Sequence, residues 1–278
     1  MTGLHTKQPL YLYLPSFTPK TNDMSKVRII IIALTLGMAS MASAQSKRLI
    51  AIDTEVGVNV RSSDKHSLAR LRGYNAAEKE IGDDRRRKDA YMICWYVGAK
   101  PEFRINEKLS FDGGIRFTLA ESRLRRKDNV SMKWKFAEKG INTMYISIDR
   151  LNQSSLYIGV PVDIRFVPAG LDATSVYLKA GASFNFRSVT LNHVETSQER
   201  MQDLYEDEIN DQIEKPDSFA LPIWMGVGIQ FGHEKGACIE LTLPYFMNLA
   251  QMSSLCKVRG SGIGLQFTYR IPTFRSND

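Results

Sequence analysis

The chain has 278 residues, of which 43% are hydrophobic and 24% charged, and a formal net charge of +7. This length suits one domain or a single barrel. Beyond Met38 no apolar run approaches the roughly 18 consecutive residues of a membrane-spanning helix, so a helical membrane protein is excluded there. The three cysteines have neither CxxC nor His-flanked spacing, so no metal site is expected from them.

An export segment is predicted near the start of the chain. Residues 24–44 begin with two cations, continue with a short apolar run and end in Ala42-Ser43-Ala44, which fits the small-x-small cleavage rule. We therefore expect a signal peptide over 24–44, cleaved near Ala44-Gln45; a membrane anchor is the alternative, disfavoured by the short run. Residues 1–23 are interpreted as an over-extended start, and 45–278 as the mature domain.

Two neighbouring segments, Leu156–Phe166 and Val176–Arg187, alternate strictly between apolar residues and a second face of glycines and charges. A period of two predicts strands, and this pairing of faces favours a lipid-facing exterior around a crowded, charged lumen. Six further segments show the same alternation: Ile50–Val60, Tyr91–Ile105, Leu109–Ala120, Phe219–Phe231, Ala237–Phe246 and Gly262–Ile271.

The connections between these segments alternate between short and long. The short ones are residues 106–108, 167–175 and 232–236, and the long ones are 61–90, 121–155, 188–218 and 247–261. Transmembrane barrels place short periplasmic turns at one rim and longer extracellular loops at the other. The sequence therefore predicts an all-β fold, an eight-stranded antiparallel transmembrane barrel with both termini on the periplasmic side.

At about eight strands, a barrel is narrow enough for side chains to fill its interior. Positions that face the expected lumen, among them Asp53, Glu55 and Lys100, carry both signs in nearly equal number. We predict a structural ion-pair network, and a conducting pore is the alternative. The principal members of the predicted ion-pair network are Glu102, Arg104, Asp112, Arg116, Asp163, Arg165, Lys179, Arg187, Glu240 and Arg270.

Two basic clusters fall in the first two long loops. Such cations suit phosphate groups of the outer-leaflet glycolipid, although runs of charge are usually solvated loops. The candidate cations are Arg85, Arg86, Arg87, Arg123, Arg125 and Arg126.

Secondary structure is also expected within the long loops. Apolar residues at helical spacing predict a helix over 197–213, and Thr196 and Glu199 are spaced as a capping box. We expect the apolar side of this helix to pack on its own protein, with a partner as the alternative. Residues 134–136 and 145–146 are expected to extend strands three and four as a hairpin above the membrane.

The chain resembles a known family in the strands LYIGVPVDIRF, VYLKAGASFNF and GIGLQFTYRI, and in the ending ASAQ of its export segment. These residues look like the Bacteroidetes outer-membrane β-barrel family, which is PorT-like or opacity- and OmpA-like. The resemblance implies an integral protein of a Gram-negative outer membrane, inserted by the barrel-assembly machinery and in contact with lipid and lipopolysaccharide. Many members of the family have no assigned activity.

We therefore expect a non-enzymatic barrel with a structural or surface-interaction role through its long loops, without cofactor, metal or nucleic acid. An extracellular or secretion-system partner is unidentified. The alternatives are a PorT-like secretion-accessory barrel, a small-solute porin, a secreted lipocalin-like ligand carrier and a lipid-modifying enzyme. The enzyme would use His193 with Ser188 or Ser197 in the third long loop, where no motif supplies an orienting carboxylate.

Overall fold

The computed structural model describes residues 49–273 with ten short gaps, at 63, 66–69, 75–79, 82–87, 127–130, 137–143, 171–173, 233–235, 247–250 and 258–259. The chain divides into two units, and every described residue belongs to the second, residues 48–278. The expected export segment, the over-extended start and Arg85, Arg86 and Arg87 lie outside the described residues.

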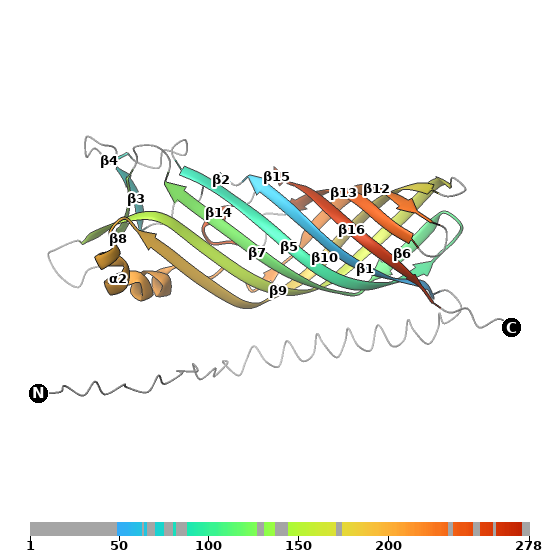
Figure 1. Ribbon diagram of the computed structural model, residues 1–278, viewed down its shortest axis with the longest axis horizontal. Helices are drawn as coiled ribbons and strands as arrows, with labels where there is room; N and C mark the ends of the chain where they lie inside the picture. The colour runs from blue at the N-terminus through green and yellow to red at the C-terminus, as the bar shows by residue number, and fades with distance from the viewer. Residues whose placement is uncertain are drawn as a thin grey trace, which may run out of the picture. The chain divides into compact units, whose positions relative to one another are not determined.

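Most of the described chain forms antiparallel strands (Figure 1). The strands of the barrel wall are β1 (Leu49–Ser62), β5 (Lys88–Arg104), β6 (Leu109–Gly113), β7 (Ile115–Arg126), β9 (Tyr145–Gly170), β10 (Thr174–Thr196), β11 (Phe219–Ala220), β12 (Pro222–Phe231), β13 (Gly236–Phe246) and β16 (Ile263–Pro272). The connections hold β2 (Asp64–Lys65), β3 (Leu71–Tyr74), β4 (Glu80–Ile81), β8 (Ser131–Lys135), α2 (Glu199–Gln212), β14 (Cys256–Lys257) and β15 (Gly260–Ser261).

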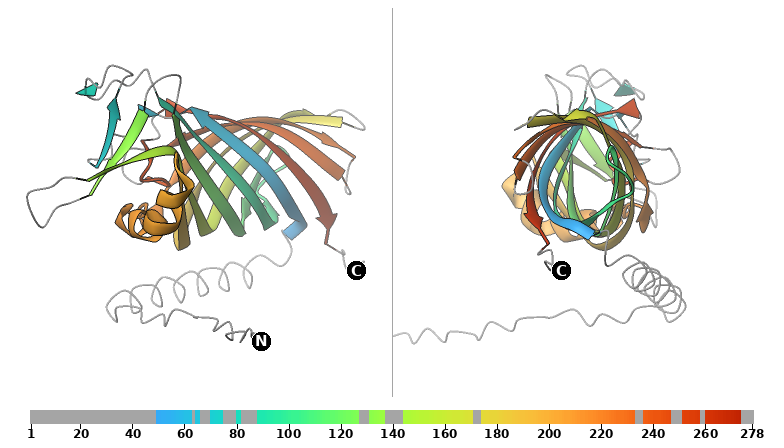
Figure 2. Two further views of the ribbon diagram at one scale, coloured as in Figure 1. Left: turned by 60° about the vertical axis from the view of Figure 1, so that its left-hand side comes forward. Right: turned by 90° about the vertical axis from the view of Figure 1, so that its right-hand side faces the viewer.

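Strand pairing closes the wall into a barrel. Each wall strand pairs antiparallel with the next along the chain, and β16 pairs back onto β1 from Ala51↔Pro272 to Val60↔Ile263. β6 and β7 form one wall strand interrupted at Gly114, and β11 and β12 form another interrupted at Leu221. Counted this way, the described residues form a wall of eight strands, and Figure 2 shows the ring end-on. The predicted fold class is confirmed.

The wall has an apolar outside and a polar inside. On β16 the outward residues Ile263, Leu265, Phe267, Tyr269 and Ile271 are 45–56% exposed, whereas the residues between them are buried. Charged side chains such as Asp53, Lys100 and Arg165 are at most 1% exposed. This arrangement reverses the usual rule for soluble proteins, and it suits a wall surrounded by lipid.

β9 and β10 are much longer than the membrane requires. They span 26 and 23 residues, against about 9–11 residues for a tilted transmembrane strand. The predicted segments Leu156–Phe166 and Val176–Arg187 were therefore too short, because both strands continue through the expected long loops. β8 pairs with the beginning of β9, with Trp134 opposite Ile146, which confirms the predicted hairpin. Within the described residues, no helix has the length and apolar character needed to cross a membrane.

Candidate functional site: the lumen and an extracellular head

The outward face of the wall changes from apolar to polar partway along β7, β9 and β10. The change is visible in four successive cross-strand rungs: Leu119–Leu156–Val189, Glu121–Ser154–Leu191, Arg123–Asn152–His193 and Arg125–Arg150–Glu195. We call the first of these the boundary rung, because below it the outward residues of these strands are apolar. The strands continue above it by up to eleven residues on β9, from Tyr145 to Ser155. The boundary rung therefore marks the upper edge of the lipid-facing band.

The inward face changes in the opposite sense a little higher, above the polar residues Ser122, Gln153 and Asn192. Above the boundary rung, the inward residues Leu124, Leu151 and Val194 are completely buried. They belong to an apolar core formed by Leu71, Leu124, Met132, Trp134, Phe136, Ile146, Ile148, Leu151, Val194, Ile209, Ile213, Leu255 and Cys256. We call this body the head; it comprises the described parts of β7, β9 and β10 above the boundary rung with β3, β8, α2 and residues 251–257. It has the inside–outside pattern of a water-soluble protein.

Helix α2 lies on β10 and closes one side of the head. Ile209 and Ile213 are at most 4% exposed within the head core, so the apolar side of the predicted helix packs on its own protein. Glu206 Oε1 lies 2.7 Å from His193 Nδ1 on β10. Gln202 Nε2 donates to the backbone oxygen of Val194. Above its pairing with β11 at Asn185 and Phe186, β10 pairs only with β9 among the described strands. The other edge of β10 is therefore open there, and α2 covers it.

The predicted capping box is not formed. The helix begins at Glu199, with Gln198 as N-cap and without a side-chain capping bond. Thr196 instead donates from its Oγ1 to the oxygen of Gln198 at 2.8 Å, and its backbone N–H donates to Gln202 Oε1 at 2.7 Å. The residue that reaches back is therefore Gln202 and not Glu199, because β10 continues as far as Thr196 and delays the first helical turn.

A network of buried ion pairs crosses the lumen below the boundary rung, and we call it the ion-pair layer. Glu55 accepts a hydrogen bond from Arg116 Nε at 2.6 Å and also lies 2.6 Å from Lys100 Nζ. Lys100 donates to Asp163 at 2.6 Å. Lys179 lies 3.7 Å from Asp163 and thereby continues the chain of alternating charges across the barrel. All five side chains are at most 6% exposed.

Aromatic rings and one further carboxylate complete the layer. Glu240 accepts from Lys179 Nζ at 2.8 Å and from the hydroxyl of Tyr177 at 3.2 Å. The guanidinium of Arg116 lies 4.4 Å from the ring centroid of Tyr96 and 4.6 Å from that of Trp224. Such stacking holds a guanidinium in place where water is excluded. Sequence analysis did not single out these rings, although alternation places each of them on the inward face.

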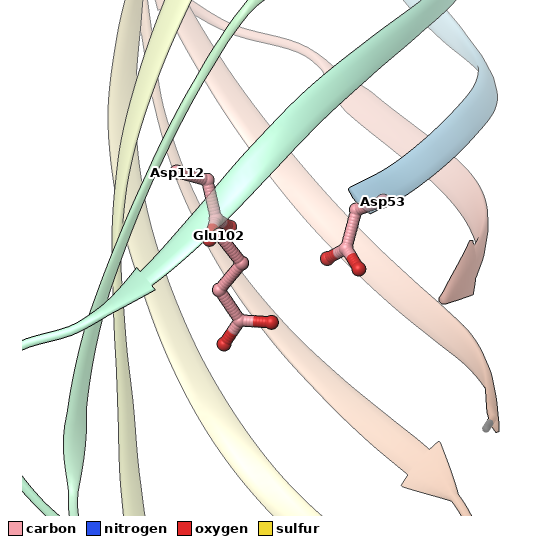
Figure 3. Close-up of side chains that lie close together, drawn as sticks. All are labelled: Asp53, Glu102 and Asp112. Atoms are coloured by element: carbon pink, nitrogen blue, oxygen red, sulfur yellow. The ribbon is translucent and has the colours of Figure 1, made fainter. Parts of the chain in front are cut away.

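A second group of charges lies toward the periplasmic end of the lumen. Figure 3 shows three carboxylates there, Asp53 on β1, Glu102 on β5 and Asp112 on β6. Arg165 Nη2 donates to Asp53 Oδ2 at 2.8 Å and lies 3.5 Å from Asp112 Oδ2. Arg270 donates to Glu102 and lies 3.4 Å from Asp53. Buried charges of both signs thus occupy the lumen at two levels.

Two of the ten predicted lumen residues lie outside this network. Arg104 is exposed, because β5 ends there and its side chain reaches the periplasmic rim. Arg187 is half-buried and donates to Thr190 Oγ1 at 3.4 Å. It stands above the ion-pair layer at a break in the β9–β10 register, and the described residues give it no ion pair. The structure brings the other eight together with Asp53, Glu55 and Lys100.

The outer mouth of the lumen is closed by residues 252–256, which we call the mouth plug. Met252 is 2% exposed and packs with lumen residues Met92, Cys94, Ala120, Tyr157 and Ala220. Gln153 on β9 holds the plug, because its Oε1 accepts from the backbone N–H of Ser254 at 2.8 Å. Its Nε2 lies 2.9 Å from the Ser254 hydroxyl. The sequence identifies this stretch only as part of the long connection 247–261.

Two of the residues considered for a lipid-modifying enzyme, His193 and Ser197, do not pair with each other. His193 faces Glu206 of α2, and the side chain is 55% exposed. Ser197 donates from its hydroxyl to Asp149 Oδ1 at 2.9 Å and not to the histidine. A nucleophile needs its base within hydrogen-bonding reach, and among the described residues these two groups have other partners. His193 instead contacts α2 through Glu206.

The described loop cations differ in their surroundings. Arg123 faces outward one rung below Arg125, and its guanidinium lies 5.6 Å from the ring centroid of Tyr91. Arg125 is exposed. Arg126 Nη1 lies 3.1 Å from Asp149 Oδ1, which occupies it in an exposed ion pair. Of these three described cations, only Arg123 and Arg125 project from the outward face above the lipid band.

No protein-family model matches the chain, and no curated protein matches it significantly. Among solved structures, outer membrane protein OprG from Pseudomonas aeruginosa is 10% identical, with a TM-score of 0.38 over 81% of this chain and 98% of that chain. Ail, the attachment invasion locus protein of Yersinia pestis, is 11% identical, with a TM-score of 0.24 over 80% and 98%. An outer membrane channel from Pseudomonas putida is 10% identical, with a TM-score of 0.25 over 81% and 96%.

The strand pairing and exterior of the chain itself define its class. A wall closed on itself leaves no unpaired edge within the membrane, as lipid requires. Its exterior residues, for example Trp95, Phe117 and Leu241, are 44–51% exposed and apolar, while charges fill the interior. The protein is an integral transmembrane β-barrel with a lipid-facing exterior.

Proposed function

We propose that this barrel is a non-enzymatic surface-interaction protein that acts through its extracellular head. The observation that carries the proposal is that the apolar residues of the wall face outward below the boundary rung and inward in the head. The chain thus has an apolar core outside the lipid band. A barrel that served only to span the membrane would need no more than short loops. Here parts of five strands, a helix and an inserted loop segment build a body with its own core that presents a defined surface.

The filled lumen favours this role over that of a small-solute porin. A solute would have to pass the mouth plug and then the ion-pair layer, where Lys100 and Glu55 are at most 1% exposed. A secretion-accessory role would use the same head with a different partner. The head is therefore the part of the molecule whose removal distinguishes these functions.

The outward cations support a contact with the outer-leaflet glycolipid as part of the same role. Arg123, beside Tyr91, is the first cation above the boundary rung on β7, and Arg125 follows one rung higher. Guanidinium groups pair well with phosphate, and aromatic rings favour the membrane interface. We propose that this contact fixes the height of a barrel inserted by the barrel-assembly machinery.

A barrel that lacks most of its head, and keeps only β3 and residues 251–257 of it, can be designed from the strand register. Ala120 and Ser155 are cross-strand partners, so a short turn that joins them removes the tops of β7 and β9 together with β8. Arg187 N–H donates to the oxygen of Ser218, so a second short turn there removes the top of β10 and α2. The wall below the boundary rung keeps its pairing. We expect this barrel-only variant to insert and to remain heat-modifiable on an unboiled denaturing gel.

Complementation of a deletion strain then tests the proposed function. The full chain and the barrel-only variant are compared for detergent resistance, attachment of cells to surfaces and the proteins released into the medium. We expect the barrel-only variant to restore detergent resistance alone. Full restoration by this variant would make the role purely structural and overturn the proposal. Loss of released proteins without loss of attachment would select the secretion-accessory alternative instead.

A further inference from the structure

Arg187 differs from the cations of the lower lumen, because the described residues give it no carboxylate partner. Five cations below it each have a carboxylate oxygen within 2.8 Å: Lys100, Arg116, Arg165, Lys179 and Arg270. Arg187 is half-buried, and its Nη1 donates to the Thr190 hydroxyl at the long distance of 3.4 Å. The acid of the neighbouring segment, Asp217, accepts instead from the backbone N–H of Gln251 at 2.5 Å. The guanidinium of Arg187 is therefore available to an anion from outside the chain.

Residues 188–191 of β10, which follow Arg187, form an open strand edge that we call the edge gap. Below the gap β10 pairs with β11, and the N–H of Arg187 donates to the oxygen of Ser218. Above the gap the described polar contacts of α2 with β10 begin at Asn192, whose Nδ2 donates to the oxygen of Asn210. Between these points the described residues pair β10 with β9 alone. An open edge presents backbone N–H and C=O groups, and lipid tails cannot satisfy them.

The edge gap lies at the upper edge of the lipid band. Its residue Val189 belongs to the boundary rung, and the register with β9 breaks between Arg187 and Val189. On the outward face, Val189 is 40% exposed and Leu191 is 68% exposed. Directly below the gap the ring centroids of Phe186 and Phe219 lie 5.3 Å apart. An apolar, aromatic surface thus ends beside an unmatched cation, at the level where the phosphate groups of membrane lipids lie.

A phosphate group in the edge gap would satisfy both the cation and the open edge. Its oxygens can accept from the guanidinium of Arg187, from the Thr190 hydroxyl and from the open backbone N–H groups. A second hydroxyl is close, because Ser155 Oγ lies 2.9 Å from Thr190 Oγ1. We propose that the edge gap binds one phosphate group of a lipid in the leaflet nearest the head. The acyl chains of this lipid lie against Phe186 and Phe219.

The bound lipid completes the wall where no strand does. Its phosphate takes the place of a neighbouring strand for residues 188–191, between the end of the β11 pairing and the first contact of α2. The site lies on β10, so it is separate from the glycolipid contact proposed for Arg123 and Arg125 on β7. It rests on the membrane placement of the wall and not on that contact.

Hydrogen exchange of the edge gap tests the proposal. The full mature barrel in a neutral detergent is titrated with lipid A that carries both phosphates, with dephosphorylated lipid A, or with inorganic phosphate. We expect the amides of residues 188–191 to exchange more slowly with the first lipid and to be unaffected by the other two additions. Equal protection by the two lipids, or none by either, would overturn the proposal. Protection by inorganic phosphate at the same concentration would assign the gap to a free anion and overturn the lipid assignment.

Three variants locate the phosphate. Arg187→Gln should raise the lipid concentration needed for protection about 10- to 100-fold, the usual effect of losing charge-assisted hydrogen bonds. Arg187→Lys keeps the charge and should retain part of the affinity, which separates lost charge from lost folding. The double variant Arg123→Gln/Arg125→Gln removes the other proposed contact and should leave protection of the gap unchanged. Heat-modifiability verifies that each variant is folded. Undiminished protection in Arg187→Gln, or its loss in the double variant, would contradict the assignment.

Discussion

At the scale of single residues, the lumen is filled because tyrosine rings lie directly over glycines of the neighbouring strand. Gly57 is the cross-strand partner of Tyr96, and a Cβ at Gly57 would come within 2.3 Å of Tyr96 Cζ. Gly228 and Tyr177 repeat the arrangement, also at 2.3 Å. Each ring can therefore lie against the neighbouring strand only because its partner has no side chain. Close packing of this kind makes the barrel interior sensitive to a single methyl group.

Replacing Gly57 by alanine tests this dependence. The added methyl group must displace the Tyr96 ring, which also donates from its hydroxyl to Gln266 Oε1 at 3.0 Å. We expect the free energy of unfolding to fall by about 1–3 kcal/mol, the usual cost of overpacking. Urea unfolding of the barrel in vesicles, followed by tryptophan fluorescence, provides the measurement.

Gly113→Ala is the matched control, because it adds the same methyl group to a wall strand with more room. The nearest atom to a Cβ at Gly113 would be Phe111 Cε1 at 3.4 Å, an ordinary contact. We expect a change of less than about 1 kcal/mol for this variant, as for a tolerated packing change. Equal losses in the two variants would show that the tyrosine–glycine contact carries no special weight.

The lumen residues were accessible to sequence reasoning because alternation alone decides which face a side chain occupies. Asp163, Arg165 and Lys179 were placed inside on that basis, and the structure buries all three. Alternation does not show where along the barrel axis a side chain lies. Arg104 obeys the pattern yet reaches water at the rim, and Arg187 lies above the ion-pair layer. Which carboxylate meets which cation depends on strand register, which the pattern leaves open.

At the scale of elements, the tops of β9 and β10 show why strand ends are hard to find in a barrel. The predicted strands ended at Leu156 and Arg187, where the apolar residues stop facing lipid. Both strands continue with the same period of two, but their apolar residues now occupy the inward positions. Leu151 and Val194 therefore lie inside. The loss of outward apolar residues therefore resembles the start of a loop, although it marks the place where the strand leaves the membrane and enters the head.

The attachment of α2 gives a prediction confined to this element. Ile209 is fully buried in the head core, and its truncation to alanine leaves a cavity there. We expect the local stability of the head to fall by about 2–5 kcal/mol. Cleavage of α2 by an added protease on intact cells should accelerate, because local unfolding precedes cleavage. The heat-modifiable mobility of the barrel should not change.

Leu204→Ala is the control on the opposite side of the helix, where the side chain is 62% exposed. This variant removes a comparable apolar side chain without opening a cavity, so the cleavage rate should equal that of the wild type. If both variants accelerated cleavage equally, helix propensity and not core packing would determine how α2 is held. If Ile209→Ala also abolished heat-modifiability, the head and the barrel would unfold as one unit.

At the scale of the whole molecule, the mouth plug and the ion-pair layer are two barriers in series. Met252 closes the mouth by apolar packing, and Gln153 holds the plug by hydrogen bonds. The layer below is held by charge pairs such as Lys179 with Glu240, which make no contact with the plug in the described residues. Because the two barriers have different chemistry and are held by different residues, the loss of one should leave the other closed.

Planar-bilayer recording tests this independence. We compare the full mature barrel with a variant in which residues 252–256 are replaced by glycine and serine. Neither should produce conductance steps, because the side chains of Lys100 and Glu55 remain at most 1% exposed across the lumen, and eight strands leave no spare width. Insertion is verified by heat-modifiability of the recovered protein. Steps in the plug variant alone would make the plug the gate of a channel, whereas steps in the full barrel would restore the porin alternative.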